Sequence, residues 1–514
     1  MASGLRFLLG RIPHGIAAAC LLTALAAPTA TASAAPGDRP NIVLVLTDDM
    51  EQQATATMPR LQALARRGAT FEAAYAITPM CVPARATILT GKYPQNTGVR
   101  SNRAPSGGYA KFHQGGMEDQ TAAVWLRNAG YRTGFVGKYI NWYPEGALPL
   151  HIPRGWDRWV ASATYPSMHN KYNYTLNEDG REVRYGETEA DYSTDVYAAK
   201  ARAFIAEAAD AGSPFLLYLW LPSPHTPEVP APRHAGLFAD AKAPRGPSFP
   251  ERDTSDKPSF LRFAPLGPAQ VDEIDRRYRE RLRMLASVDE ALGSIEDLLE
   301  ARGLLDDTYI VFSADHGWHQ GQHNQMPMKG RPHEEDIRVP LVVAGPGVPA
   351  GRTIRRLIGH ADLAPTFADW AGVTPDTVVD GRSFAGLLTA DEPARFPWRR
   401  RLPILRSIEG VAVATRWATF LPEAASPEAY TCLEHLVPTA TRAWYEWRGL
   451  RSETLTYVEH VNGDRELYYA PVGDPFQIHN AYCRADPAWR NQLAIQTAAL
   501  TTCRGESCRR AEDW

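Results

Sequence analysis

Cys81 is the only cysteine between the first few dozen residues and position 432, and its neighbours form an unusual pattern. It opens the segment Cys81-Val-Pro-Ala-Arg85-Ala-Thr-Ile-Leu-Thr-Gly-Lys-Tyr-Pro, in which a cation follows a nucleophile by four positions. A free cysteine is more often a small buried apolar residue than a reactive one. An odd cysteine left over after the others are paired nevertheless indicates a chemical use.

Acidic residues follow two apolar runs that are typical of buried strands. Asp48 and Asp49 come after residues 41–46, and Asp315 with His316 comes after residues 309–312. A helix cap or a turn would also use such residues. Adjacent carboxylates repel each other unless a cation lies between them, so a metal site is the better interpretation, and three carboxylates suit a hard cation.

A zinc site is the alternative, because His316, His319 and His323 follow one another closely. Such spacing requires a helix or a dedicated loop. Gly317 and Gly321 argue against a helix there. The hard-cation interpretation is therefore preferred.

The elements that must position these residues are strands alternating with helices. Further buried-strand runs occupy residues 215–221 and 341–344, and residues 271–302 have apolar positions at helical spacing. This alternation predicts an α/β domain with a parallel sheet. Ligand-binding groups then collect beyond the carboxyl ends of the strands. Residues 226–268 are rich in proline and charge, and we expect a long irregular excursion near the site.

Length and pattern predict two domains after a leader. The chain has 514 residues, of which 44% are hydrophobic and 22% charged, typical of a globular protein. Residues 1–34 have the basic start, apolar run and small-residue end of a secretory signal peptide, so we expect export. Residues 38–395 would form the catalytic domain. Residues 400–514 would form a smaller α+β domain, with strands at 455–459 and 466–469 and a helix at 487–500.

Charge and hydropathy restrict the possible partners. The formal net charge is −3, or −5 without Arg6 and Arg11 of the leader. A mildly acidic protein has no general attraction to nucleic acid or to anionic membrane. No segment after the leader is apolar for the 18 or more residues of a membrane span. An anionic substrate would therefore have to be held by local charges.

Four cysteines lie near the C-terminus. In an oxidising compartment they suggest two disulfides with three possible pairings. The short loop between Cys503 and Cys508 favours that pair, which leaves Cys432 with Cys483.

The Cys81 segment resembles the signature of the type I, formylglycine-dependent sulfatases. A bare Cys-x-Pro-x-Arg is a weak pattern, but the extension through Leu-Thr-Gly-Lys-Tyr-Pro is specific. The resemblance covers nearly the whole mature chain, and the sequences of its motifs are similar to those of the N-acetylglucosamine-6-sulfatase group. It implies an alkaline-phosphatase-like α/β fold with a large mixed, mostly parallel sheet flanked by helices and a smaller C-terminal α+β domain. It also implies that a formylglycine-generating enzyme oxidises Cys81 during maturation.

The resemblance further implies a site. Matched by position, one divalent ion, usually calcium with magnesium as the alternative, would be held by Asp48, Asp49, Asp315, His316 and an oxygen of modified Cys81. The implied catalytic residues are Cys81, Arg85, Lys138, His225 and Lys329. Many sulfatases have a histidine soon after the lysine that matches Lys138. In this chain Tyr139, Ile140 and Asn141 follow it, so the base that breaks down the sulfated intermediate is not identified.

The implied reaction is hydrolysis of a sulfate ester on a sulfated small molecule or glycan. We expect the 6-sulfate of a glucosamine unit, partly because of the resemblance. The other part is the supply of aromatic side chains for stacking on sugar rings at Trp142, Tyr143, Trp156, Trp159 and Tyr165. Simple core packing would account for the same residues. Alternatives are a broad arylsulfatase, a phosphatase or phosphonate monoester hydrolase of the same superfamily, and a non-catalytic sugar-binding protein with Cys81 unmodified.

Overall fold

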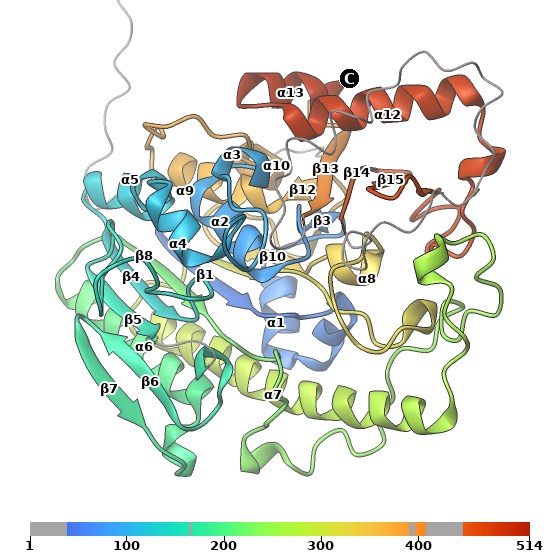
Figure 1. Ribbon diagram of the computed structural model, residues 1–514. Coiled ribbons are helices and arrows are strands. Elements are labelled where there is room, and N and C mark those ends of the chain that lie inside the picture. The colour runs from blue at the N-terminus through green and yellow to red at the C-terminus, as the bar shows by residue number, and fades with distance from the viewer. Residues whose placement is uncertain (1–38, 164–166, 390–395, 408–445) are drawn as a thin grey trace, which may run out of the picture.

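A ten-stranded mixed sheet forms the centre of the computed structural model, which describes residues 39–163, 167–389, 396–407 and 446–514. The strand order is β11-β2-β10-β9-β1-β8-β4-β5-β6-β7 (Figure 1). Their bounds are β1 Asn41–Thr47, β2 Ala69–Phe71, β4 Arg132–Gly137, β5 Arg158–Ser162, β6 Tyr174–Glu178, β7 Arg181–Tyr185, β8 Phe215–Trp220, β9 Thr308–Ala314, β10 Leu341–Ala344 and β11 Arg352–Ile354.

The middle of the sheet is parallel, as the apolar runs predict. Strand β1 pairs in parallel with β8 on one side and β9 on the other, so that Leu44 lies opposite Tyr218 and Val311. Every residue of these three strands is buried. A strand that is covered on both faces needs a continuous apolar sequence, which explains their composition. Strand β10 lies where a strand is expected and runs antiparallel to β9, so the sheet is mixed and mostly parallel, as the resemblance implies.

Helices cover both faces of the sheet (Figure 1). On one face, α1 (Pro59–Arg67) and α6 (Ser193–Asp210) pack against the long helix α7 (Pro268–Ala301). On the other face, α2 (Cys81–Thr90) and α5 (Ala122–Asn128) pack against α9 (Leu363–Trp370). The helix expected from apolar spacing at 271–302 is α7, and most of its apolar positions are buried. This arrangement buries one large core between sheet and helices.

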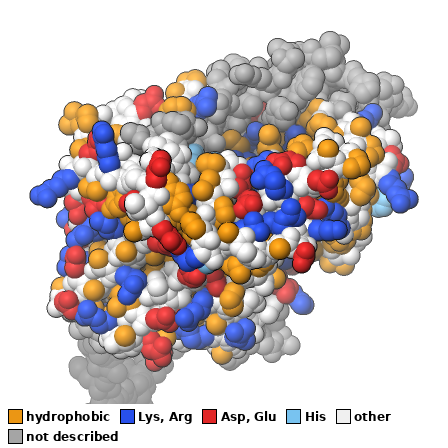
Figure 2. Space-filling view, turned by 90° about the horizontal axis from the view of Figure 1, so that it is seen from below, with side chains coloured by type: hydrophobic (Ala, Val, Ile, Leu, Met, Phe, Trp, Pro, Cys, Tyr) orange, Lys and Arg blue, Asp and Glu red, His pale blue; other side chains and the backbone are white. Residues whose placement is uncertain are grey.

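The excursion after β8 contains little regular structure, as its composition predicts. Its helical turns are η6 (Pro232–His234) and η7 (Ser259–Leu261). Several of its side chains are nevertheless buried, among them Phe249, Glu251 and Lys257. On the face shown in Figure 2, basic and acidic side chains are interspersed, in keeping with the nearly balanced composition.

A second, four-stranded antiparallel sheet follows near the C-terminus. Its strands are β13 Arg401–Arg406, β14 Trp447–Ser452, β15 Thr456–His460 and β16 Arg465–Tyr468. Helices α12 (Pro487–Thr502) and α13 (Glu506–Asp513) pack on it (Figure 1). The strands expected at 455–459 and 466–469 and the helix at 487–500 correspond to β15, β16 and α12. The boundary near residue 400 stays a prediction.

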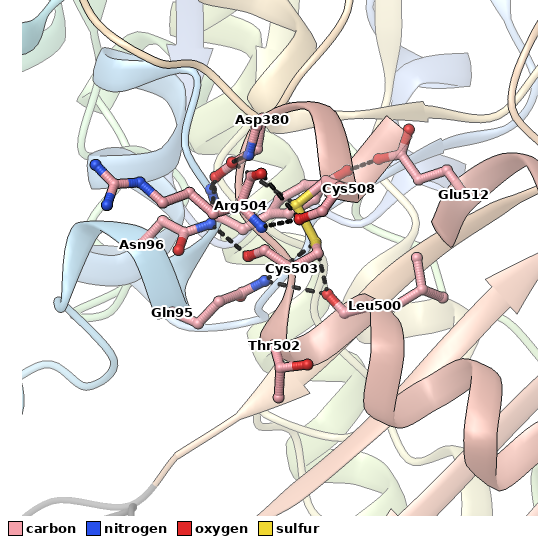
Figure 3. The surroundings of a disulfide bond; sticks show 12 residues. Gln95, Asn96, Asp380, Leu500, Thr502, Cys503, Arg504, Cys508 and Glu512 are labelled. Carbon is pink, nitrogen blue, oxygen red and sulfur yellow. Dashed lines mark hydrogen bonds between the residues drawn. A yellow bond between two sulfur atoms is a disulfide. The ribbon is translucent and has the colours of Figure 1, made fainter. Parts of the chain in front are cut away.

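The preferred disulfide is present between Cys503 and Cys508. Figure 3 shows that Gln95 and Asn96, which belong to the N-terminal part of the chain, point toward this loop. Asn96 Nδ2 donates to the main-chain oxygen of Cys503 at 2.8 Å and to Asp380 at 2.9 Å. The C-terminal helices are therefore tied to the main body.

Two predictions fall outside the described residues. Cys432, the expected partner of Cys483, and the leader at 1–34 both lie there. Among the helices that are described, none is long and apolar enough to cross a membrane.

Candidate active site

The carboxyl ends of four neighbouring strands meet at one edge of the sheet, and the predicted site residues lie there. Asp48 and Asp49 follow β1, and Asp315 and His316 follow β9. Lys138 follows β4, and His225 follows β8 after a short turn. Parallel strands bring their carboxyl ends to the same edge, so residues that are far apart in sequence become neighbours.

Cys81 is the first residue of α2, and the helix explains the spacing of the motif. Pro83 lies in the first turn, where its missing N–H is tolerated. Arg85 is one turn after Cys81 and therefore shares its face of the helix. All ten residues of α2 are buried. Gly91 ends the helix with a φ of 66°, and a Cβ there would lie 3.1 Å from Pro365 Cδ.

The Arg85 guanidinium connects three strand ends. Its Nε donates to Asp315 Oδ2 at 3.0 Å, and a terminal nitrogen lies 3.6 Å from Asp48 Oδ2. Its other terminal nitrogen donates to the main-chain oxygen of Lys138 at 2.7 Å. Arg85 and both carboxylates are fully buried. A planar group with donors in several directions suits this position better than a lysine would.

The remaining groups close around Cys81 and Asp49. Lys329 Nζ lies 3.0 Å from Cys81 Sγ and also donates to Asp49 Oδ1. His316 Nε2 lies 3.2 Å from Asp49 Oδ1, and His225 Nε2 lies 3.6 Å from Asp49 Oδ2. Lys138 Nζ donates to Asp48 Oδ2. The predicted catalytic residues and the predicted hard-cation ligands are thus part of one connected cluster.

The donor set fits a divalent cation. One ligand atom each from Asp48, Asp49, Cys81 and His316 lies within 4.8 Å of the others. Asp49 Oδ2 is buried and has no hydrogen-bond partner among the described residues. Asp315 lies beside this group, with an oxygen 3.6 Å from His316 Nε2. Buried carboxylates that converge in this way are stable only with nearby positive charge, and oxygen-rich sets suit calcium or magnesium.

Electrostatics within the cluster are strong because water is excluded. Burial would raise the pKa of Asp48, but Lys138 and the other cations hold it well below its ordinary value. Burial lowers the pKa of His316, but the carboxylates of Asp315 and Asp49 outweigh this effect and raise it to about 9. Burial would lower the pKa of Lys329, but Asp49 and Cys81 outweigh this effect and raise it.

Two functional candidates were not identified from the sequence. The His169 ring stacks on that of His225 with a centroid distance of 3.9 Å, and the two imidazoles with Asp48 form a further close group. Lys171 Nζ donates to the main-chain oxygens of His169 and His225, at 2.6 and 3.0 Å. Burial lowers the pKa of this lysine to about 7. None of the motifs named from the sequence includes His169 or Lys171.

The other two histidines of the zinc alternative contact residues away from His316. His319 Nδ1 is 2.8 Å from Asp336, and His323 Nδ1 is 2.7 Å from Glu251. Within the described part of the chain, His319 and His323 do not join His316 in any group of possible metal ligands.

The aromatic residues near Lys138 mostly belong to the core. Tyr143, Trp156 and Trp159 are buried in the main apolar cluster, so their proposed role in sugar stacking is wrong. Trp142 is only partly buried, and the Arg103 guanidinium lies 5.1 Å from its ring. Tyr165 lies outside the described residues.

Comparisons with known proteins identify the family of this chain. A family model described as Sulfatase matches residues 40–373. N-acetylglucosamine-6-sulfatase from Capra hircus is 32% identical over 492 residues, which are 92% of this chain and 85% of that protein. Arylsulfatase from Volvox carteri is 32% identical over 542 residues, which are 96% of this chain and 78% of that protein.

A solved structure of a protein in complex with its substrate D-glucosamine-2-N,6-O-disulfate is similar at a TM-score of 0.70 and 23% identity. The match covers 90% of this chain and 97% of that one, and it shows the shared alkaline-phosphatase-like fold. The family model matches more than half of the chain, and the N-acetylglucosamine-6-sulfatase is 32% identical over 92% of it. The chain therefore belongs to the sulfatase family and is a sulfuric ester hydrolase.

Proposed function

We propose that this sulfatase works through a formylglycine made from Cys81 and hydrolyses the 6-sulfate of a glucosamine unit. The observation that carries the mechanism is the position of Cys81 at the start of α2. Its Sγ lies 3.0 Å from Lys329 Nζ and 3.6 Å from Asp48 Oδ1. Cys81 is also the free cysteine among the described residues.

The modification supplies what a thiol or an alcohol lacks. A hydrated formylglycine carries two hydroxyl groups on one carbon. One attacks the sulfur of the ester, and deprotonation of the other lets the sulfated intermediate collapse to the aldehyde and release sulfate. A formylglycine-generating enzyme would be the maturation partner.

A divalent ion would be held by Asp48, Asp49, Asp315, His316 and the oxygen at position 81. When bound, it supplies positive charge that favours the ionised nucleophile and the sulfuryl oxygens. The carboxylate-rich set favours calcium or magnesium.

The cationic side chains bind and orient the sulfate group. Lys138 and Lys329 approach the acidic pair from two sides, so an anionic sulfuryl group would meet both ammonium groups. Arg85 holds the acidic side chains in place through its contacts with Asp48 and Asp315. His225 would protonate the departing alcohol. His169, stacked on it, is the nearest candidate for the proton acceptor that the sequence did not identify.

The substrate is the finer part of the proposal. The two relatives described above act, by their names, on N-acetylglucosamine 6-sulfate and on aryl sulfates, at the same 32% identity. The partly buried Trp142 supports the sugar, since an aromatic face suits the apolar face of a pyranose. We further propose that residues 1–34 direct export, and that residues 38–395 and 400–514 form the catalytic and the smaller domain.

The test is release of inorganic sulfate from 6-sulfated, 2-sulfated and N-sulfated glucosamines and from an aryl sulfate, side by side with an aryl phosphate. Preferential turnover of the 6-sulfate supports the proposal. Faster turnover of the phosphate would favour the phosphatase alternative. Intact mass of the peptide that contains Cys81 distinguishes formylglycine from the unmodified cysteine of a non-catalytic protein.

A further inference from the structure

A second cluster of metal-binding side chains lies outside the active site. It comprises His113 in α4 (Gly108–Gln114), Glu118 in η3 (Met117–Gln120) and His151 in the loop between β4 and β5. One ligand atom from each lies within 4.8 Å of the others. We propose that these three side chains bind Zn²⁺ or a similar transition-metal ion, which ties the loop to α4 and η3.

The distances from Glu118 to the two histidines are close to those between ligands of a tetrahedral site. His113 Nδ1 and His151 Nε2 each lie 3.0 Å from Glu118 Oε2. Around a zinc ion with bonds of about 2.0 Å, neighbouring ligand atoms are roughly 3.3 Å apart. Each of the two nitrogens is therefore within a few tenths of an ångström of the separation from Glu118 Oε2 that a bound ion would require. The two imidazole planes meet at 71°, so the rings converge without stacking.

The carboxylate is held by an outer partner. Tyr109 Oη donates to Glu118 Oε1 at 2.5 Å, which leaves Oε2 directed at the two histidines. Metal sites commonly fix their ligands through such a second hydrogen bond.

Exposure and ligand type distinguish this site from the active site. The side chain of Glu118 is 9% exposed, whereas those of His113 and His151 are 28% and 26% exposed. An ion can therefore enter from solvent, and water can fill the fourth position. Two imidazole nitrogens favour zinc, while the carboxylate-rich active site favours a hard cation.

The cluster touches the segment that leads from the active site. Tyr143 donates to the main-chain oxygen of His151. The Tyr143 ring packs edge-on against Tyr109 and Tyr139, with centroids 5.1 and 5.8 Å away. Tyr139 directly follows Lys138. A bound ion would thus restrain this segment at a second point and raise the melting temperature.

The test uses the full-length Cys81→Ala protein, because the substitution removes the thiol of the active site. Excess Ca²⁺ is present to occupy the active site. Calorimetric titration should show one equivalent of Zn²⁺ bound per chain, in addition to the Ca²⁺ in the active site. His113→Gln and His151→Gln should each weaken this binding at least about tenfold, and Tyr109→Phe should weaken it about tenfold. His479→Gln removes an exposed histidine outside the cluster and should bind Zn²⁺ like the parent.

Two further measurements keep the test decisive. Co²⁺ should give the intense d–d bands of a tetrahedral site in the parent and lose them in both histidine variants. Zn²⁺ should raise the Tm of the parent. A histidine variant that melts at the same temperature as the parent without metal should show no such rise. Absence of Zn²⁺ binding by the parent, or binding and cobalt spectra unchanged by either histidine substitution, would overturn the proposal.

Discussion

Lys329 Nζ lies 3.0 Å from Cys81 Sγ, and the same ammonium group donates to Asp49. One side chain thus joins the residue to be modified to the acidic pair. Because the pKa of Lys329 is raised by Asp49 and Cys81, the group keeps its charge at neutral pH. An anionic oxygen at position 81 would be stabilised by that charge.

Replacing Cys81 tests the chemistry at this position. We expect Cys81→Ser and Cys81→Ala to lose essentially all multiple-turnover sulfate release, since neither side chain can form the geminal diol. Serine is similar in size to cysteine, so Tm should change little in that variant. Near-normal turnover by either variant would contradict the formylglycine mechanism.

Removing one proposed metal ligand should affect activity and stability together. Asp315→Asn should lower sulfatase activity by more than about tenfold and lower Tm by a few degrees, because a bound ion stabilises the folded state. Exhaustive chelation of the parent protein should reproduce both effects.

The exposed Asp306 near the start of β9 provides the matched control. Asp306→Asn removes the same charge from the surface and should leave activity and Tm near those of the parent. If chelation changes neither quantity in the parent, the proposed metal site is wrong.

The proposed acid His225 predicts a pH dependence. Burial lowers its pKa well below the ordinary value of 6.5, so the protonated form is scarce at neutral pH. If His225 must donate a proton, kcat/KM for a sugar sulfate should fall about tenfold per pH unit above pH 6.5. Measured pH profiles of the parent and of His225→Gln check this.

The leaving group serves as the internal control for this prediction. A nitrophenyl sulfate releases a stable phenolate and needs little protonation. His225→Gln should therefore slow the sugar sulfate much more than the aryl sulfate and should remove the alkaline decline. Equal loss on both substrates would assign His225 to another role.

Trp142 is the remaining aromatic candidate for contact with the sugar. Trp142→Ala should lower kcat/KM for glucosamine 6-sulfate by several-fold while aryl sulfate activity stays largely intact, since a lost stacking contact is worth about 1 kcal/mol. The control is Trp156→Phe, because Trp156 lies in the buried core. This substitution should lower Tm and should leave the ratio of the two activities unchanged. A ratio unchanged by Trp142→Ala would contradict a stacking contact between Trp142 and the sugar.

A buried ion pair connects the segment before β13 to the main body. Arg399 donates to both carboxylate oxygens of Asp362 at 2.6 Å, and both side chains are fully buried. Arg399→Met would leave that carboxylate without its partner, so we expect a loss of about 3–5 kcal/mol in the free energy of unfolding. Chemical denaturation measures it. The adjacent Arg400 is exposed, and Arg400→Gln should change stability by less than about 0.5 kcal/mol.

Much of the architecture could be predicted from local pattern. Continuous apolar runs identified the strands β1, β8 and β9, because a strand that is buried on both faces is apolar throughout. Apolar residues at helical spacing identified α7, because one face of that helix is buried. The acidic residues after β1 and β9 could be placed at one edge, since parallel strands share a direction. The spacing of Cys81 and Arg85 likewise predicts a shared face once a helix is assumed.

Tertiary structure decided what local pattern does not encode. The direction of β10 depends on pairing with β9, and an apolar run of four residues is the same in either direction. His169 and Lys171 reach the site from a turn without a motif, and only the packing of that turn on His225 brings them there. Tyr143, Trp156 and Trp159 became core residues for the same reason. A residue's type states what chemistry it can do, whereas its partners depend on contacts between segments far apart in the chain.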